Sequence, residues 1–344
     1  MSKIRSLYQL GSNHWKLFSK SYSTSPPKIA LLFPGQGSQH VGMGHDIYNE
    51  YAAAREVIDE CEESLGARLR DVMFDGPQNL LTQTINAQPA ILCHSIALLR
   101  VMEKEFGFNT KECAYAMGHS LGEYTALVAT NSLTLSEAIK LVRLRGEAMQ
   151  NSVSQTATAM KALMVIGNHL EDIEELMPRL KRSLPRGEVA EIANVNSRSQ
   201  IVLSGTENGV KYAASVFHSK GFAGRSLPLP VSAPFHCSLM APAYEIMGPA
   251  LDATDFKQPD VEVISNVTSR PFVDTKEIRT LLKRQILETV QWQRCLRYAK
   301  DDFVFDWVVV GPSKVLSNLV RKEFPHDTIR SVSNASDVRN GVWS

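Results

Sequence analysis

The segment that most constrains the fold is residues 113–145, where a short apolar run leads into Gly118-His119-Ser120-Leu121-Gly122. We expect a buried strand over 113–117 and an apolar helix from Glu123 to Arg145. Strand, Gly-x-Ser-x-Gly and helix form the arrangement of a nucleophile elbow, in which glycines permit a tight turn with the serine at its apex. The helix start would direct backbone N–H groups at charge developing beside the serine. The pattern predicts a nucleophilic Ser120; the alternative is a tight structural turn with an unreactive serine.

The composition of the chain excludes several function classes. Its 344 residues suffice for one large domain with an insertion, or for two domains. A net charge of +1 gives no indication of a nucleic-acid partner or an acidic membrane surface. The longest apolar run, 303–310, is too short to span a bilayer, so no membrane insertion is expected. The five cysteines show no CxxC or Cys/His ligand spacing, which favours a reduced compartment and no metal site.

The first 27 residues differ from the rest of the chain. They contain Lys3, Arg5, Lys16 and Lys20 and many serines, and the first acidic residue is Asp46. The segment lacks the continuous apolar core of a secretory signal. This profile predicts a mitochondrial transit peptide over residues 1–27, and hence a mitochondrial matrix protein; the alternative is a disordered basic tail.

The remaining chain reads as a series of strand-loop-helix units, which predicts an α/β core over residues 28–157 and 229–335. Strands are expected over 29–33, 261–265 and 303–310 because these runs are apolar enough to be buried on both sheet faces. Helices are expected from Asp46 onward, after Gln88-Pro89 with the proline at the helix start, and over 280–298. The parallel-sheet core would resemble that of a hydrolase.

Residues 158–228 show a different order of predicted strands and helices. Strands are expected at 160–166, 189–195, 200–203 and 223–227, and helices at 169–181 and 207–220. This βαββαβ order predicts a ferredoxin-like subdomain inserted into the core.

A serine nucleophile needs a base, and His236 is the best candidate among the nine histidines. It follows Pro230 and Pro234 in a stretch that cannot be helical interior, so the loop can hold an imidazole in place. His119 is interpreted as a packing or hydrogen-bonding residue on the opposite side of the elbow. A hydrolase would also place an acid between the serine and the histidine, but none follows an evident core strand there.

Arg145 is a second informative residue. It lies near the end of a predicted helix, two residues from Arg143, so at most one of the two faces the site. A guanidinium suits bidentate capture of a carboxylate. The alternative is a solvated charge on a helix.

Six ordered motifs together resemble the malonyl-CoA:acyl carrier protein transacylase family and the related acyltransferase domains of fatty-acid and polyketide synthases. They are residues 33–39 (FPGQGSQ), 118–123 (GHSLGE), 145–146 (RG), 234–236 (PFH), 290–292 (VQW) and 311–316 (GPSKVL). The resemblance covers about residues 28–331, and the inserted βαββαβ unit fits it. We therefore identify the chain as similar to a mitochondrial member of this family.

The resemblance implies a role for each matching residue. Ser120 would be the nucleophile and His236 its base. The backbone N–H groups of Gln36 and Leu121 would form the oxyanion hole, and the backbone carbonyl of Gln291 would steady the histidine. Substrate-binding positions would be Arg145, which would grip the malonyl carboxylate, and Gln88, Met149 and Asn196 near the acyl pocket. No cofactor is implied, because the coenzyme A thioester is a substrate.

The implied partners are malonyl-CoA and a free-standing acyl carrier protein, and the chain is expected to work as a monomer in mitochondrial fatty-acid synthesis. Because carrier proteins are acidic, a basic rim near the site is expected, with Lys181, Arg182, Arg186 and Lys314 as candidates. Two other functions remain open: a serine hydrolase or thioesterase with the same Ser-His pair, and a non-catalytic scaffold that binds the carrier protein.

Overall fold

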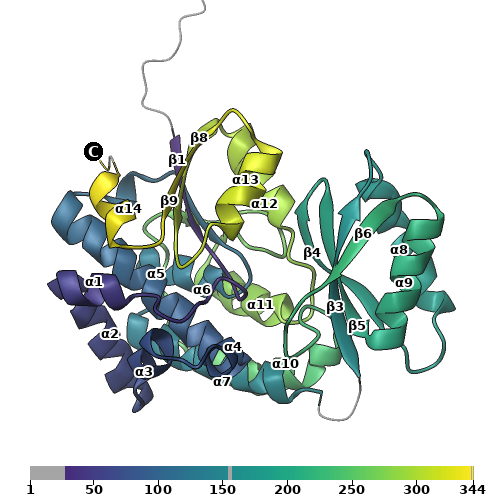
Figure 1. Cartoon of the computed structure of the whole chain (residues 1–344), viewed down its shortest axis with the longest axis horizontal. Helices are drawn as coiled ribbons and strands as arrows, with labels where there is room; N and C mark the ends of the chain where they lie inside the picture. Colours follow the sequence, from purple (N-terminus) through teal and green to yellow (C-terminus); the bar gives the residue numbers. More distant parts are fainter. Residues whose placement is uncertain (1–27, 154–156, 342, 344) are drawn as a thin grey trace, which may run out of the picture.

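The computed structural model describes residues 28–153, 157–341 and 343 and contains two β-sheets that lie side by side (Figure 1). The predicted transit peptide, residues 1–27, lies outside the described residues. The larger sheet is parallel, with the order β7-β2-β1-β8-β9. Its strands are β1 (Lys28–Phe33), β2 (Tyr115–Gly118), β7 (Glu262–Val263), β8 (Val304–Val310) and β9 (Thr328–Val332). The predicted parallel-sheet core is therefore confirmed.

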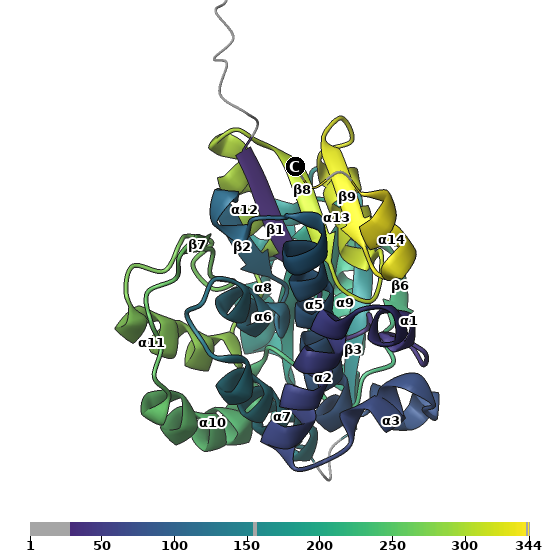
Figure 2. The same ribbon diagram turned by 90° about the vertical axis from the view of Figure 1, so that its left-hand side faces the viewer.

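Helices cover both faces of this sheet, as the continuous apolar strands require. Along β1, Leu31 and Phe33 pack on one face and Ala30 and Leu32 on the other, all fully buried. Figure 2 shows α2, α5 and α7 together on the first face. The helices of that face are α1 (His45–Glu50), α2 (Ala52–Leu65), α3 (Leu69–Phe74), α4 (Gln78–Thr82), α5 (Thr84–Phe106), α6 (Gly122–Ala129), α7 (Leu135–Asn151), α10 (Ala241–Ala253), α11 (Thr275–Gln285) and α14 (Ala335–Asn340). The other face is covered by α12 (Trp292–Asp301) and α13 (Val315–Glu323).

The smaller sheet is antiparallel, with the order β4-β5-β3-β6. Its elements are β3 (Thr158–Val165), α8 (Leu170–Ser183), β4 (Ala190–Ser197), β5 (Gln200–Thr206), α9 (Glu207–Ser219) and β6 (Ala223–Pro228). This is the βαββαβ order that the sequence predicts. The helices pack on one face, where Leu163 and Leu203 are buried, and strand alternation turns Met160 and Val202 to the face toward the core.

The helix after Gln88-Pro89 begins earlier than expected. Pro89 is not at its start but inside α5, which begins at Thr84. A proline inside a helix leaves the carbonyl four residues earlier without its donor, here that of Ile85. Arg143 supplies the missing donor, because its Nη1 lies 3.0 Å from the Ile85 oxygen.

Three predicted helices are each broken in two. The pattern from Glu123 to Arg145 is interrupted because α6 ends at Ala129 and Thr134 caps a new helix, accepting a hydrogen bond from the Glu137 N–H at 3.2 Å. The helix expected from Asp46 breaks at Tyr51, which is extended. The helix expected over 280–298 is divided into α11 and α12 by residues 286–291.

One described helix, α5, is long and apolar enough to cross a membrane, yet 83% of its most apolar window is buried inside the protein. It therefore has the character of a core helix. All five cysteines are buried free thiols, and no cluster of His, Cys, Asp or Glu able to hold a metal ion occurs in the part of the chain that the structure describes.

Candidate active site

Ser120 occupies the tight turn between β2 and α6, with a left-handed backbone φ of 53°. The turn brings backbone segments together closely. A Cβ on Gly118 would lie 1.8 Å from the carbonyl carbon of Gly122, and one on Gly122 would lie 2.2 Å from the carbonyl oxygen of Phe33. No residue with a Cβ fits at either position, so the packing of this turn explains the Gly-x-Ser-x-Gly spacing.

His236 meets Ser120 at this turn. Its Nε2 lies 2.7 Å from the Ser120 Oγ, and its Nδ1 lies 2.7 Å from the backbone oxygen of Gln285. Because a carbonyl only accepts, Nδ1 carries the proton and Nε2 is left to accept from the serine hydroxyl. The predicted Ser-His pair is therefore brought together in the tautomer that a general base needs.

The His236 imidazole is buried, with only 3% of its surface exposed. Burial, the largest cause, and the neighbouring charge of Arg145 together lower its pKa to about 3, although the hydrogen bond to Gln285 acts in the opposite direction. The ring is consequently neutral near pH 7 and free to accept a proton.

The carbonyl that steadies His236 belongs to Gln285 and not to Gln291, so the position inferred from the resemblance is wrong. The side-chain oxygen of Gln291 instead accepts a hydrogen bond from Arg294, and its backbone N–H donates to the backbone oxygen of Asn266 at 2.8 Å. Gln285 is the last residue of α11, and carbonyls in the last turn of a helix lack intrahelical donors. The break between α11 and α12 thus frees an acceptor for the histidine.

Arg145 approaches the same hydroxyl and is only 2% exposed. Its Nη2 lies 3.2 Å from the Ser120 Oγ and 2.8 Å from Oε1 of Gln285, and its Nη1 lies 2.8 Å from Oε1 of Gln88. Burial lowers its pKa, but these neutral acceptors support the cation. Arg143 turns away to bond Ile85 and Asn86, which confirms that only one of the two arginines faces the site.

The three other residues that the resemblance predicts to bind substrate lie in two places. Asn196 lines the cavity and accepts a hydrogen bond from His119 Nε2 at 2.8 Å. Gln88 and Met149 are buried beside Arg145, with the Gln88 amide 3.8 Å from the Met149 sulfur. His119 is the hydrogen-bonding residue that the sequence predicts, although its ring also lines the cavity instead of facing away from it.

Gln36 and Leu121 flank the serine from two elements. Gln36 lies in the loop after β1 and lines the cavity, and Leu121 directly follows Ser120 at the start of α6. Neither backbone N–H has a hydrogen-bond acceptor within residues 28–153 and 157–341. Two free donors of this kind beside a nucleophile suit a developing oxyanion.

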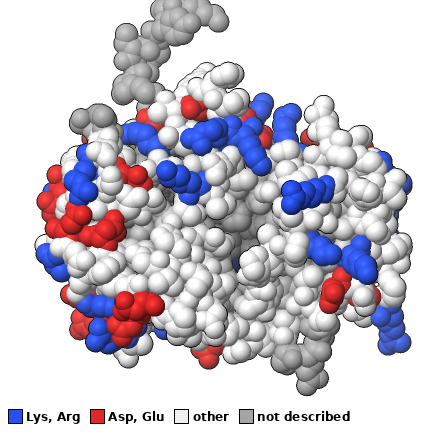
Figure 3. Space-filling model, viewed as in Figure 1, with Lys and Arg blue, Asp and Glu red and all other residues white. Residues whose placement is uncertain are grey.

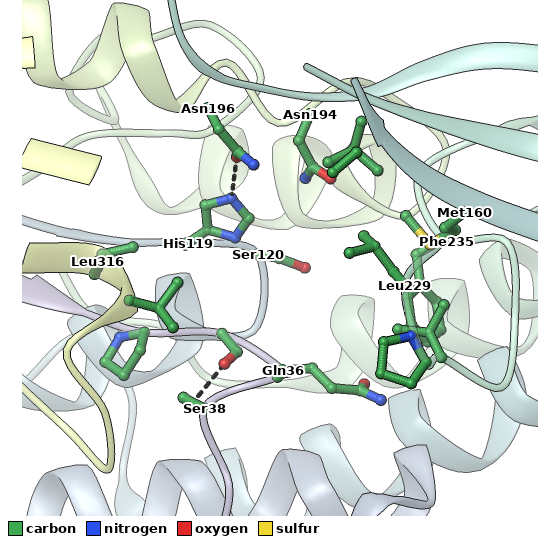
Figure 4. Close-up of a pocket in the computed structure, with 18 of the residues that line it drawn as sticks. Gln36, Ser38, His119, Ser120, Met160, Asn194, Asn196, Leu229, Phe235 and Leu316 are labelled. Carbon is green, nitrogen blue, oxygen red and sulfur yellow. Dashed lines mark hydrogen bonds between the residues drawn. The ribbon is translucent and has the colours of Figure 1, made fainter. Parts of the chain in front are cut away.

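A cavity of about 540 Å³ lies between the elbow and the inner face of the small sheet, and of the site residues it is lined by Gln36, His119, Ser120, Asn196 and His236. Figure 4 shows Ser120 pointing into it, with Asn194 and Asn196 on one side and Gln36 on the other. The cavity is lined by no Lys, Arg, Asp or Glu side chain among the described residues, and several of the lining side chains are amides: Gln36, Gln39, Gln78, Asn194, Asn196 and Gln200. The walls of the cavity therefore suit an uncharged part of a ligand that carries amide groups.

Comparisons with known proteins agree with this geometry. Residues 30–336 match the family described as "Acyl transferase domain". The chain is 41% identical to the malonyl CoA-acyl carrier protein transacylase of Bacillus subtilis (strain 168), over 86% of this chain and 90% of that protein. The chain belongs to the malonyl CoA-acyl carrier protein transacylase family.

Solved structures show the same relationship to this transacylase family. The acyl-carrier-protein S-malonyltransferase of Bartonella henselae superposes with a TM-score of 0.84 at 37% identity, covering 91% of this chain and 97% of that one. A malonyl-transacylase in complex with a type II polyketide synthase acyl-carrier protein superposes with a TM-score of 0.84 at 31% identity, covering 92% and 99%.

Besides Gln285, two further residues of this transacylase site were not predicted from the sequence. Asn266 accepts a hydrogen bond from the Ser120 N–H at 2.7 Å and donates one to the Gly118 oxygen at 2.7 Å, which ties the elbow together. Glu123, fully buried in the first turn of α6, accepts from the Asn266 N–H at 3.1 Å. Glu123 belongs to the GHSLGE motif, so its position was visible in the sequence, whereas Asn266 lies in no motif that carries a signal.

The candidate basic rim is only partly near the cavity. Lys314 is exposed next to Val315, which lines the cavity. Lys181 and Arg182 instead line a separate groove beside α8, and Arg186 is exposed in the loop that follows α8. Figure 3 shows a hollow between the two sheets with mainly uncharged walls and Lys and Arg side chains around its rim.

Proposed function

We propose that this acyl-carrier-protein S-malonyltransferase works through a malonyl ester on Ser120. One observation carries the proposal: the Ser120 Oγ lies 2.7 Å from the His236 base and 3.2 Å from the Arg145 cation. A base activates the hydroxyl, and a cation beside it suits an acyl group that carries a free carboxylate. The transacylase relatives support malonyl-CoA and acyl carrier protein as the two substrates of the chain.

In the first half-reaction, the Ser120 Oγ attacks the thioester carbonyl of malonyl-CoA while its proton passes to Nε2 of His236. The tetrahedral intermediate carries an oxyanion, which the N–H groups of Gln36 and Leu121 stabilise. Loss of one such donor costs about 2.7–4 kcal/mol in comparable sites. The intermediate then collapses, the C–S bond breaks, and the coenzyme A thiol leaves with the proton from His236.

In the second half-reaction, the phosphopantetheine thiol of acyl carrier protein gives its proton to His236 and attacks the ester carbonyl. The C–O bond breaks, Ser120 regains its proton, and the malonyl group leaves as a thioester of the carrier protein. The amide-rich cavity supports phosphopantetheine as the acceptor of the malonyl group. A phosphopantetheine arm carries two amide groups, and the asparagine and glutamine side chains of the cavity can form hydrogen bonds with them.

Arg145 determines the acyl group in this proposal. A malonyl ester on Ser120 carries its carboxylate two carbon atoms beyond the bond to Oγ, close to the guanidinium that now contacts that oxygen. The carboxylate pairs with a buried cation whose present acceptors are neutral amides and a hydroxyl. An acetyl group leaves this charge without an ionic partner, so the site discriminates against it.

The hydrolase alternative is less well supported. Nδ1 of His236 faces a backbone carbonyl and no carboxylate among the described residues, whereas a hydrolase of this chain order uses an acid there.

Intact-mass measurement after brief mixing with malonyl-CoA, without an acceptor, tests the proposal. We expect a malonyl adduct on Ser120 that persists and disappears when acyl carrier protein is added. An adduct that turns over to free malonate would support the hydrolase, and no adduct would support the non-catalytic scaffold. Ser120→Ala is the matched control.

We also propose that the chain works in the mitochondrial matrix, supplying fatty-acid synthesis there. The support is the composition of residues 1–27, with four basic and no acidic residues, ahead of a family match that begins at residue 30. Fusion of residues 1–27 to a fluorescent reporter should direct the reporter to mitochondria. A reporter spread through the cytosol would refute this location, and replacing the four basic residues by glutamine provides the control.

A further inference from the structure

Glu123 is a buried acid that the proposed mechanism does not use. Its side chain lies beneath the elbow in the first turn of α6 and has no exposed surface. One carboxylate oxygen accepts from the Asn266 N–H at 3.1 Å, and the other accepts from Nε2 of Gln285. Because a buried carboxylate is costly, a carboxylate held at this point requires a reason.

The Gln285 amide joins this carboxylate to the arginine. Its Oε1 accepts a hydrogen bond from Nη2 of Arg145 at 2.8 Å. Its Nε2 donates to the carboxylate of Glu123 and, at 2.9 Å, to the backbone oxygen of Ser120. A cation at one end and an anion at the other permit only one orientation of the amide. The backbone carbonyl of the same residue accepts the proton of His236 Nδ1. Gln285 therefore contacts the base, the cation and the backbone of the nucleophile.

We infer that Glu123 is the positioning residue that orients Gln285 and, through it, holds Arg145 and His236 in their working geometry. The inference rests on the proposed function, because it assigns these two groups their parts in malonyl transfer. It also explains how the buried arginine is compensated in the free enzyme: Glu123 supplies the opposite charge one amide away. A hydrolase has an acid in direct contact with its histidine, whereas here the acid, Glu123, contacts Gln285, and Gln285 contacts the histidine.

A pH profile separates this role from simple packing. Burial raises the pKa of Glu123 to about 7, against hydrogen bonds from Gln285 and Asn266 that lower it. Of the titratable groups that face it, Arg145 of α7 remains a cation, and burial raises the pKa values of Cys295 of α12 and Tyr124 of α6 far above neutrality.

The base does not titrate in the same range, because burial lowers the pKa of His236 to about 3. Protonation removes one of the two acceptor oxygens of Glu123 and so weakens the hold on Gln285. The rate of Ser120 acylation by malonyl-CoA should therefore fall about tenfold from pH 8 to pH 6, as one site that titrates at about pH 7 dictates.

Glu123→Gln is the first test. A glutamine offers one acceptor where the site needs two, so one N–H must oppose another N–H whichever way its amide turns. We expect acylation by malonyl-CoA to drop at least tenfold at pH 8 and to become independent of pH between 6 and 8. Glu147→Gln, the same change at an exposed position on α7, should keep the rate and the profile of the native enzyme.

Gln285→Met is the second variant, and it decides the matter if Glu123→Gln does not fold. Methionine has a similar volume and leaves the backbone carbonyl for His236, but it removes the amide between Arg145 and Glu123. We expect the same low, flat profile, and no further loss in the double variant. A native rate in either variant, or an unchanged inflection near pH 7, would overturn the inference. A native enzyme that forms no malonyl adduct would instead refute the proposed function.

Discussion

Replacement of Arg145 by methionine tests the source of acyl selectivity directly. Methionine fills similar space but carries no charge, so malonyl-CoA loses the partner of its carboxylate. Removing one member of a buried, hydrogen-bonded charge pair costs about 2–5 kcal/mol. At about 1.36 kcal/mol per factor of ten, kcat/KM for malonyl transfer should fall between about thirtyfold and several thousandfold.

Acetyl-CoA provides the internal comparison, because it has no carboxylate to lose. The 3.2 Å contact between Arg145 and the Ser120 Oγ disappears for both substrates, so the ratio of the two kcat/KM values isolates the carboxylate. We expect acetyl transfer to be unchanged or faster. Transfer to acyl carrier protein, measured for each thioester by mass spectrometry, gives the ratio. An equal loss for malonyl and acetyl groups would refute the assigned role of Arg145.

The same variant should be less stable, for a reason visible in the structure. It leaves Oε1 of Gln88 and of Gln285 without the donors that now lie 2.8 Å away. An unsatisfied buried acceptor costs about 1–3 kcal/mol, so denaturant unfolding should show a loss of up to a few kcal/mol. Arg143→Met is the matched control: it removes a half-buried arginine from the same helix and should leave the malonyl-to-acetyl ratio unchanged.

Three further outcomes are expected. His236→Ala should slow malonyl-adduct formation on Ser120 by about 10²–10⁴-fold in quenched-flow mass measurements, the usual contribution of a general base, and a smaller loss would assign the base elsewhere. The buried His94 has a pKa lowered by burial from 6.5 to about 3, so the unfolded chain binds its proton first as the pH falls and stability drops below pH 6.5. His94→Leu should therefore remove about 2 kcal/mol of the stability lost between pH 7 and pH 5 in urea unfolding, and an unchanged pH slope would contradict this. Gly122→Ala should abolish soluble expression or cost about 4 kcal/mol or more, because its Cβ would lie 2.2 Å from the Phe33 oxygen, whereas Gly248→Ala, with open space around it in α10, should stabilise by about 0.5–1 kcal/mol; similar melting temperatures for the two would refute the packing argument.

The sequence was informative wherever a residue type leaves little choice. The Gly-x-Ser-x-Gly spacing identified the elbow because no side chain fits at Gly118 or Gly122. The prolines before His236 indicated a loop that holds this imidazole in place. The alternation of apolar residues was enough to place all six elements of the small subdomain in order.

The sequence was uninformative in two situations. In one, the functional group is a backbone atom; in the other, a residue far along the chain supplies a hydrogen bond that is missing locally. The acceptor for His236 is a backbone carbonyl, which any residue type supplies, so Gln285 carried no signal. Pro89 lies inside α5 because Arg143, 54 residues later, bonds the carbonyl that the proline leaves free. The spacing of apolar residues also predicted one continuous helix where the structure has a break between α11 and α12. The site depends on that break, because it frees the carbonyl of Gln285 for His236.

The backbone at Ser120 also restricts which nucleophiles this fold accepts. Both Ser120 and His236 have left-handed φ values, 53° and 56°, which β-branched side chains rarely adopt. Threonine would keep a hydroxyl at position 120, but its branched Cβ opposes the turn that presents it. Cysteine is unbranched and fits the same backbone. The backbone conformation therefore limits the nucleophile at position 120 before its reactivity matters. The fold can accept cysteine, which would form a thioester intermediate in place of an ester, but it cannot accept the secondary alcohol of threonine.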